Sequence, residues 1–232
     1  MVTMGLICAR AGSKGVPGKN LADVGGRSLL VRAIDTAHAA GIDRVIVSTD
    51  SEDIAAAARA AGAEVPFIRP SELSSDRAPE WLVWRHAIGW MTQNLGALPD
   101  ALAVVPTVSP LRAPADVRTC LALFERERPD VVITVTEARR NPWFNMVTIG
   151  TDGQAKLVNH PVGRIARRQD APAVYDMATV AYVVRPQFVI EAESLFAGIV
   201  RAVVVPPERA IDIDEPFDLV VARAVASKVE KP

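Results

Sequence analysis

Short apolar runs alternate with segments of helical periodicity along most of the chain, and this alternation constrains the fold more than any other feature. Strands are expected at residues 3–9, 44–49, 64–68, 101–105, 130–136, 179–184 and 201–206. Helices are expected at residues 28–40, 51–62, 81–94, 114–128 and 216–229. Strands that alternate with helices favour a mostly parallel sheet with helices on both faces. We therefore predict a Rossmann-like, doubly wound α/β fold.

The alternation is interrupted between about Glu137 and Asp170. Turn signals at residues 141–142 (Asn-Pro) and 152–153 (Asp-Gly) flank short strand-like segments, which predicts a β-hairpin excursion and not another βαβ unit. The excursion also contains apolar side chains that a free loop tip would not carry: Trp143, Phe144 and Met146. Either a partner subunit or the domain itself should cover them. Otherwise we expect residues 1–232 to form a single domain.

Overall charge gives no reason to expect a polyanionic partner. The chain has 26 Lys and Arg against 27 Asp and Glu, so we expect neither nucleic acid nor a membrane surface as partner. The two cysteines form no CxxC pattern, the N-terminus has no signal-peptide layout, and no apolar stretch approaches the roughly 18 residues of a membrane span. These features predict a cytoplasmic protein. Any anion specificity must come from local clusters.

The clearest local cluster is the loop RAGSKGVPGKN, residues 10–20, directly after the first predicted strand. It combines Arg10, Lys14 and Lys19 with three glycines, but its spacing does not fit a Walker A loop, because five residues separate Gly12 from Gly18 and Asn20 follows Lys19. Gly12 and Gly15 would let backbone N–H groups turn toward a phosphate. The alternative interpretation is a basic surface loop with glycines for turning.

A second cluster, IDIDEPFDL, follows the last predicted strand. Asp212 and Asp214 are two residues apart, so both carboxylates would face the same side of an extended segment. Paired carboxylates suit Mg²⁺, which prefers oxygen ligands and often shares them with substrate phosphates. Alternatively, Asp214 or Glu215 caps the terminal helix that begins near Pro216. Because ligands bind at the carboxyl ends of strands in open α/β sheets, this cluster and the loop should meet at one site.

A third cluster, GRIARRQDAPAVYD, contains Arg164, Arg167 and Arg168. An Arg side chain can bind a carboxylate through two parallel hydrogen bonds. The alternative is a solvated basic face.

Five blocks, in order along nearly the whole chain, resemble the acylneuraminate (CMP-sialic acid) cytidylyltransferases. They read ICARAGSKGVPGKN, VIVSTDSEDIAAAARAAGAEVPFIRPSELSSD, VVPTVSPLR, RRQDAPAVY and IDIDEPFDL. The resemblance implies a homodimeric nucleotidyltransferase that couples CTP to a 3-deoxy-2-keto sugar acid, with Mg²⁺ as cofactor, giving CMP-sugar and pyrophosphate. It also implies that the excursion at about 137–170 is the dimerisation segment.

The resemblance assigns roles to particular residues. It implies that the triphosphate lies on the glycine-rich loop, with Arg10, Gly12, Ser13, Lys14 and Lys19. The cytosine would lie near Asn20, Arg69 and Ala78. The sugar acid would face Arg168, Gln169 and Tyr182. The Mg²⁺ would be held by Asp212 and Asp214. Catalysis would depend on Arg10, Lys14, Lys19 and Asp212.

The chain departs from the family pattern where that pattern meets the sugar. Pro106 and Val108 stand where the family has Gln and Thr. Asp176 stands for an Arg, and Ala178 and Thr179 stand for an Asn-Gly pair. A legionaminic- or pseudaminic-type acid is therefore an alternative acceptor, whereas the loop is unlike that of octulosonic-acid enzymes. Two further alternatives are a transferase for another nucleotide or for a sugar phosphate, and a non-catalytic nucleotide-binding module.

Overall fold

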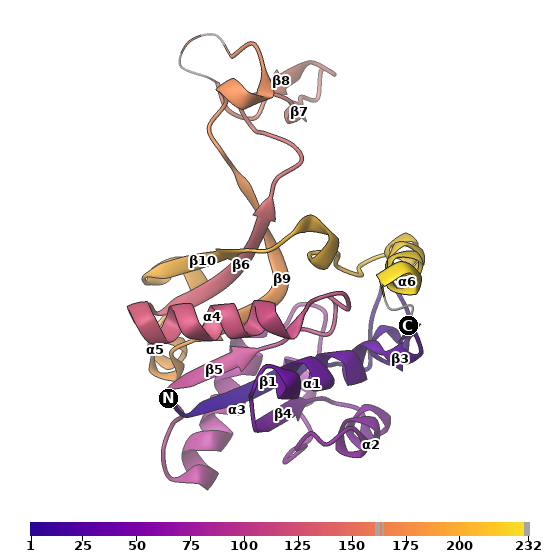
Figure 1. Cartoon of the computed structure of the whole chain (residues 1–232), viewed down its shortest axis with the longest axis vertical. Coiled ribbons are helices and arrows are strands. Elements are labelled where there is room, and N and C mark those ends of the chain that lie inside the picture. The colour runs from indigo at the N-terminus through magenta and orange to yellow at the C-terminus, as the bar shows by residue number, and fades with distance from the viewer. Residues whose placement is uncertain (161–162, 164, 230–232) are drawn as a thin grey trace.

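In a computed structural model, which describes residues 1–160, 163 and 165–229, a six-stranded sheet forms the centre of the molecule (Figure 1). Its strands, in spatial order, are β10 (Val200–Val204), β6 (Val131–Glu137), β9 (Tyr175–Val184), β5 (Ala101–Val104), β1 (Thr3–Cys8) and β4 (Arg44–Ser48). β1 pairs in parallel with β4 and β5, and β6 pairs in parallel with β10. Only β9, among the described strands of this sheet, runs antiparallel to its neighbours. The predicted mostly parallel sheet is confirmed.

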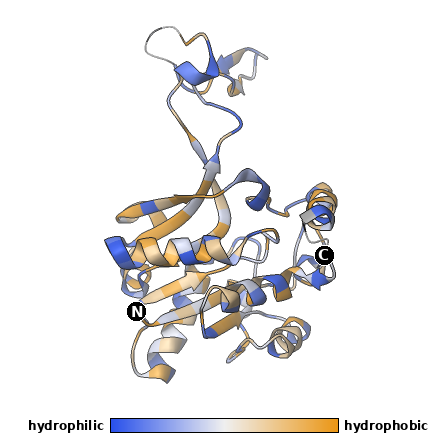
Figure 2. Ribbon diagram, viewed as in Figure 1, coloured by the Kyte–Doolittle hydropathy of each residue, from blue (hydrophilic) through white to orange (hydrophobic). Residues whose placement is uncertain are grey.

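Helices cover both faces of this sheet, as predicted. Their bounds are α1 (Leu29–Ala39), α2 (Glu52–Ala60), α3 (Glu80–Leu95), α4 (Pro114–Glu127), α5 (Pro186–Glu191) and α6 (Pro216–Val229). Apolar side chains of α1, α2 and α4 pack on one face, and those of α3 and α5 pack on the other. Ser28 and Ser51 accept hydrogen bonds from backbone N–H groups three residues on, which fixes where α1 and α2 begin. Figure 2 shows the strands of the sheet as the most consistently hydrophobic segments.

The strand predicted at residues 64–68 forms only isolated bridges, from Glu64 to Ile46 and from Ile68 to Thr49. Pro66 lies between them and has no N–H group to donate to a ladder, which explains the interruption. The Arg69 N–H nevertheless donates to the Thr49 carbonyl over 2.7 Å, so this segment still brings Arg69 to the carboxyl end of β4.

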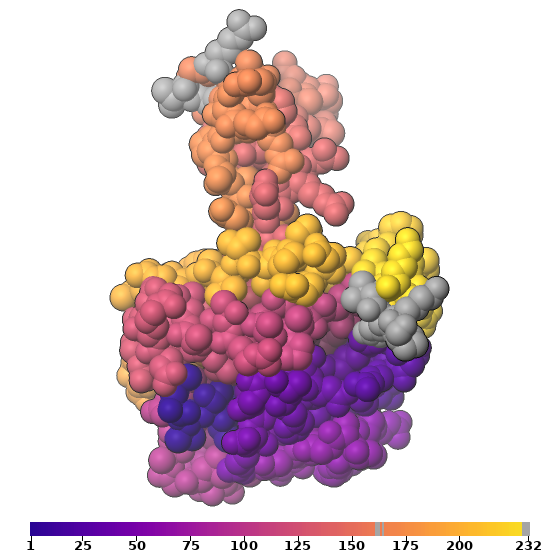
Figure 3. Space-filling view, viewed as in Figure 1, coloured from indigo at the N-terminus to yellow at the C-terminus, as the bar shows by residue number. Residues whose placement is uncertain are grey.

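The predicted excursion stands away from the body of the molecule on a narrow base (Figures 1 and 3). We call residues 138–174, which connect β6 to β9, the arm. Within it, β7 (Val147–Ile149) and β8 (Ala155–Leu157) form an antiparallel pair. The arm leaves and rejoins the body at one point, where the Ala138 N–H donates to the Val174 carbonyl over 3.1 Å.

The apolar side chains of the arm divide into two groups. Trp143 and Phe144 are half-buried, so the arm partly covers them itself. The others are more exposed: Met146 is 41% exposed, Val147 54% and Ile149 73%.

Among the described residues, no helix is both long enough and apolar enough to cross a membrane.

Candidate active site

The glycine-rich loop lies over the carboxyl ends of β1 and β4, where several strand-end groups hold it. The Ala9 N–H donates to the Ser48 carbonyl over 3.0 Å, and the Ala11 N–H donates to Asp50 Oδ1 over 2.8 Å. The buried Asn20 amide donates to the Arg10 carbonyl over 2.8 Å and accepts from Thr107 Oγ1 over 2.6 Å. Asn20 therefore positions the loop through its side chain, a role that the sequence did not suggest.

Each cation of the loop meets a carboxylate. Arg10 Nη1 and Lys14 Nζ each lie 2.7 Å from a different oxygen of Asp76, and these cations, Lys14 first, lower the pKa of Asp76. Lys19 Nζ donates to the Ile213 carbonyl over 2.6 Å and lies 3.4 Å from Asp214 Oδ1. The loop thus gathers three positive charges at the carboxyl end of β1, as the sequence predicted.

Gly15 lies against the second carboxylate cluster. A Cβ atom at this position would fall 1.9 Å from the Asp214 carbonyl oxygen, so no larger residue fits there without movement of backbone. A Cβ at Gly12 would have no atom within 4 Å. Close backbone approach, and not the freedom to turn, is therefore what requires glycine at position 15.

A cavity of about 360 Å³ opens beside the loop. Four of its lining residues were predicted to bind substrate or metal: Arg10, Arg69, Ala78 and Asp214. Others were not predicted as site residues, among them Asp76, Glu80 and Thr179. Three of the departures from the family pattern line it: Pro106, Val108 and Thr179. Ser13 lies half-buried on the loop and does not line it.

Arg69 is the most unusual group in the cavity wall. Its side chain is only 4% exposed, yet its Nε and Nη2 atoms have no hydrogen-bond acceptor among the described residues. The Asp50 carboxylate lies 3.8 Å from Nη2, close enough for an ion pair but too far for a hydrogen bond. Because buried donors normally find acceptors, these N–H groups indicate a ligand with acceptor atoms in the cavity.

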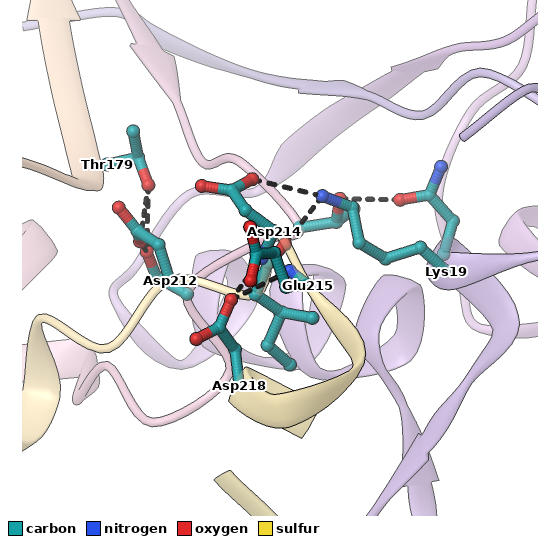
Figure 4. A network of polar contacts seen from close by, with 10 residues as sticks. Lys19, Thr179, Asp212, Asp214, Glu215 and Asp218 are labelled. Carbon is teal, nitrogen blue, oxygen red and sulfur yellow. Dashed lines mark hydrogen bonds and ion pairs between the residues drawn. The ribbon is translucent and has the colours of Figure 1, made fainter. Parts of the chain in front are cut away.

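Asp212 and Asp214 face different partners (Figure 4). Asp212 Oδ1 accepts hydrogen bonds from Thr179 Oγ1, over 2.5 Å, and from Ser109 Oγ, whereas Asp214 Oδ1 faces Lys19. Within the described part of the chain, the Oδ2 atom of each carboxylate makes no hydrogen bond or ion pair. Two free carboxylate oxygens suit a hard cation such as Mg²⁺. They do not form a complete site, since the described residues contain no group of three His, Cys, Asp or Glu able to hold a metal.

Asp218 fixes the segment that carries these acids. Its Oδ2 atom accepts from the Asp214 N–H over 2.9 Å and from the Glu215 N–H over 2.7 Å (Figure 4). The sequence had suggested Asp214 or Glu215 as the acid that caps α6. Instead, a residue within the first turn of the helix reaches back to the two N–H groups that precede it.

Buried Arg112 fixes the neighbouring segment after β5. Its Nε atom donates to the Ser109 carbonyl over 2.9 Å, and its Nη2 atom donates to the Pro106 carbonyl. Burial lowers the pKa of Arg112, and the negative charge of Asp212 partly opposes that effect. Both carbonyls are thereby held in place, and so is the backbone on which the Ser109 hydroxyl sits.

The residues predicted to meet a sugar acid do not line this cavity. Arg168 and Gln169 lie on the arm and line a separate cavity of about 330 Å³, where Arg168 donates to the Ala138 carbonyl and lies 3.6 Å from Glu137. Arg167 pairs with Asp170 over 2.9 Å, and Arg164 lies outside the described residues.

Tyr182 is buried in the core, with its ring 5.5 Å from that of Trp84. Burial, together with the charges of Glu80 and Asp212, raises the pKa of Tyr182 to about 12. On β9, Asp176 is exposed beside Thr136 and Ala178 is buried beside Thr134.

Comparison with known proteins identifies relatives that are cytidylyltransferases. A family model described as cytidylyltransferase matches residues 4–83. The chain is 33% identical to post-translational flagellin modification protein B of Campylobacter coli, over 91% of this chain and 89% of that protein. It is 32% identical to a CMP-N,N'-diacetyllegionaminic acid synthase of Campylobacter jejuni (95% and 93% covered). It is 34% identical to a 3-deoxy-manno-octulosonate cytidylyltransferase of Azorhizobium caulinodans (95% and 94% covered).

Solved structures match over nearly the full length. A CMP:2-keto-3-deoxy-manno-octonic acid synthetase complexed with CTP aligns with a TM-score of 0.72 at 19% identity, covering 98% of this chain and 99% of that one. A 4-diphosphocytidyl-2C-methyl-D-erythritol synthase of Anaerococcus prevotii aligns with a TM-score of 0.64 at 14% identity, covering 97% and 98%. Identity over the whole chain does not separate the legionaminic from the octulosonate enzymes, although the loop had suggested a difference. The chain belongs to the cytidylyltransferase family and is a nucleotidyltransferase.

Proposed function

We propose that this enzyme transfers the CMP group of CTP to a 3-deoxy-2-keto sugar acid of the nonulosonic type and releases pyrophosphate. The observation that carries the proposal is the cavity that Arg69 and Arg10 line together, with Lys14 beside Arg10 on the Asp76 carboxylate. Arg69 offers buried donors without acceptors, as recognition of a polar base requires. Arg10 and Lys14 offer positive charge for a triphosphate. The relatives named as synthases of CMP-sugar acids support the acceptor class.

The reaction we propose is a direct displacement at phosphorus. The anomeric hydroxyl oxygen of the sugar acid forms a bond to the α-phosphorus of CTP, the bond from that phosphorus to the β-phosphate oxygen breaks, and the hydroxyl proton passes to solvent. Arg10, Lys14 and Lys19 stabilise the charge that develops on the phosphate oxygens. Such positioning and charge stabilisation account for most of the catalysis in phosphoryl transfer.

Asp212 and Asp214 would hold the Mg²⁺ ion. This assignment is supported by their free Oδ2 atoms, since Mg²⁺ commonly binds one or two carboxylates and completes its shell with substrate phosphates and water. The bound ion would neutralise phosphate charge and acidify the attacking hydroxyl. The protein's part is to keep both carboxylates beside the loop, through Ser109, Thr179 and Asp218.

We further propose that the arm is the dimer contact of a single nucleotidyltransferase domain, and that Arg168 and Gln169 meet the sugar acid at a partner's site. Support comes from the exposed apolar residues of the arm and from its position away from the body (Figure 3). Support also comes from the second cavity at its base. We also propose that the protein is cytoplasmic. Its acceptor would be a nonulosonic acid and not an octulosonate.

Pyrophosphate release with CTP and Mg²⁺ against a panel of 3-deoxy-2-keto sugar acids tests the proposal directly. Release with at least one nonulosonic acid is expected, together with protection from thermal unfolding by CTP but not by UTP, ATP or GTP. Equal protection by another nucleotide would favour a different transferase. Protection by CTP without turnover on any acceptor would favour a non-catalytic nucleotide-binding module.

The first predicted variant concerns Lys19, which is only 13% exposed and bonded to the Ile213 carbonyl. Lys19→Ala should lower kcat/KM for CTP by about 10²–10³, because removal of one such charge stabiliser typically costs that much. Lys228→Ala, near the end of α6, removes a lysine outside the site and serves as the matched control. Near-normal turnover of Lys19→Ala would remove Lys19 from the catalytic group.

A further inference from the structure

Thr179 contributes a hydroxyl group to the carboxylate that we assign to the metal. Its Oγ1 atom donates to Asp212 Oδ1 over 2.5 Å, and Ser109 Oγ donates to the same oxygen (Figure 4). The two hydroxyl oxygens lie 3.1 Å apart. Three segments far apart in the sequence therefore meet at one oxygen atom: β9, the turn after β5 and the segment after β10.

The two hydroxyl groups bring two protons to three close contacts. Each hydroxyl carries a single proton, and a carboxylate has none to give. If both hydroxyls donate to Oδ1, no proton is left for a bond between Ser109 and Thr179. Their 3.1 Å contact then follows from sharing one acceptor. Oδ1 is held by two charge-assisted hydrogen bonds, which are stronger than neutral ones.

Both donors are themselves fixed. Ser109 is fully buried, and its carbonyl accepts from the Arg112 guanidinium over 2.9 Å. Thr179 lies on β9 between the buried residues Ala178 and Val180, and a β-branched side chain has few χ1 rotamers available. The Asp212 carboxylate consequently cannot rotate without breaking two bonds. Its Oδ2 atom makes no hydrogen bond to any described residue.

We propose that Thr179 is a positioning residue which, together with Ser109, makes Asp212 present a single oxygen to the divalent cation and thereby favours Mg²⁺ over Ca²⁺. The inference rests on the proposed function for the presence of the metal. Mg²⁺ demands near-ideal octahedral geometry, which one-oxygen carboxylate ligands allow, whereas Ca²⁺ readily takes both oxygens of a carboxylate in a larger, more flexible shell. Because Oδ1 already accepts two hydrogen bonds, the carboxylate cannot bind a cation through both of its oxygens.

Thr179 is one of the departures from the acylneuraminate pattern. The acylneuraminate pattern has glycine at the position of Thr179, and glycine has no hydroxyl group to donate. The departure therefore supplies a hydrogen bond where the family pattern has none. It also places a side chain in the wall of the cavity that holds Arg69, since Thr179 is one of its lining residues.

The test compares Thr179→Val, which keeps the shape and removes the hydroxyl, with Thr179→Ser, which keeps the hydroxyl. Mn²⁺ binding in the presence of CTP, without sugar acid, is measured from the electron paramagnetic resonance signal of free Mn²⁺ against the same Mn²⁺ and CTP without protein, and Mg²⁺ and Ca²⁺ are then added as competitors. Thr179→Val should weaken Mn²⁺ and Mg²⁺ binding by about tenfold, the usual effect of losing a hydrogen bond to a metal ligand. Ca²⁺ binding should change by less than about threefold, and Thr179→Ser should stay near the unaltered protein.

Two controls separate positioning from general damage. Thr119→Val removes a hydroxyl on the exposed side of α4 and should leave metal binding unchanged. Thermal unfolding midpoints show whether each variant is folded. Unaltered Mn²⁺ binding by Thr179→Val, an equal loss for Ca²⁺, or a loss in Thr179→Ser as large as in Thr179→Val would each overturn the inference. If the unaltered protein itself bound no Mn²⁺ with CTP, the metal assignment in the proposed function would fall as well.

Discussion

Gly15 lies where two functional segments touch. Its neighbour is the carbonyl group of Asp214, so the loop that carries the cations packs backbone to backbone against the segment that carries the acids. Lys19, at the other end of the loop, also donates to the Ile213 carbonyl. The two segments are therefore joined at two places. Contacts with the main chain of residues 213–214 thus set the position of the loop relative to the acidic segment.

Gly15→Ala should weaken CTP binding at least tenfold. The added methyl group would lie 1.9 Å from the Asp214 carbonyl oxygen, so either the loop or the acidic segment must move. Gly12→Ala is the matched control on the same loop, because its Cβ would meet nothing within 4 Å, and it should change affinity by less than about threefold. Isothermal titration with CTP measures both. A loss as large in Gly12→Ala would show that the contact with Asp214 is not what matters.

Residues whose role depends on local spacing were predictable from the sequence, and their distant partners were not. Arg10, Lys14 and Lys19 stand out because three cations among glycines follow a buried strand. Asp76 and Thr179, in contrast, belong to no motif and acquire their roles only because folding brings them to a cation or to Asp212. Asn20 was assigned a place near the base, but its amide binds the loop and Thr107.

The loop at residues 70–79, which includes the 3₁₀ turn Ser71–Leu73, connects the segment at residues 64–69, which follows α2, to α3. Its Asp76 lies between Arg10 and Lys14, with one carboxylate oxygen on each cation. On the proposed function, a triphosphate that binds these cations would therefore compete with the Asp76 carboxylate for the same charges.

Asp76→Asn should strengthen the binding of CTP and of inorganic pyrophosphate by about threefold to tenfold, because it removes the competing charge. Glu72→Gln removes an acid from the same loop that contacts no cation among the described residues, so it should have no effect. Titration calorimetry with each ligand provides the comparison. Weaker binding by Asp76→Asn would instead show that the carboxylate orients Arg10 and Lys14 for the ligand.

Asp130 joins three elements at the opposite end of the sheet. Directly before β6, its carboxylate accepts from the Arg185 guanidinium at the end of β9 and from the Ile199 N–H at the start of β10, over 2.7 Å. The hydrogen bond from Arg185, with a smaller contribution from Ile199, holds the pKa of Asp130 below its ordinary value. The ionised form is thus favoured in the folded state.

Asp130→Asn should lower the free energy of unfolding by about 1–2 kcal/mol at pH 7, since hydrogen bonds to a charged group contribute about 1.5–3 kcal/mol and partial exposure reduces this. Because the pKa is lowered on folding, this contribution is present above the ordinary Asp value of about 3.9 and is lost as pH falls through the lower, folded value. Urea unfolding at pH 7, 5, 4 and 3.5 should show the difference shrinking. Exposed Asp43→Asn is the control, and a difference independent of pH would exclude the charge as its cause.

For the molecule as a whole, the sheet and the longer helices were predictable because period and length identify each element, whereas the short helix α5 was missed. The parallel or antiparallel direction of β9 was not, because a fully buried strand carries no sequence signal of direction. The prediction at residues 64–68 was wrong as a strand, since Pro66 interrupts the ladder. The arm was located correctly from its turns, but nothing in its sequence showed that it would stand away from the body.

The arm leaves Val147 and Ile149 exposed, which leads to a prediction about assembly. Sedimentation velocity at micromolar concentration should show a dimer, and Ile149→Asp should shift it to a monomer, because a charge would be buried in an apolar contact. Phe217→Asp, at a 71% exposed position of α6, is the control and should remain dimeric. An unaltered protein that sediments as a monomer would contradict the dimer.

The narrow base of the arm has a consequence for how such enzymes diversify. Since Ala138 and Val174 close the connection, we expect that the intervening segment can change in length or sequence with little effect on the strands on either side. Arg168 and Gln169 lie within that exchangeable module, whereas the loop cations and the paired acids lie outside it. On our assignment, a change in the arm would therefore alter the choice of sugar acid and the dimer contact together. The residues that bind CTP would stay unchanged.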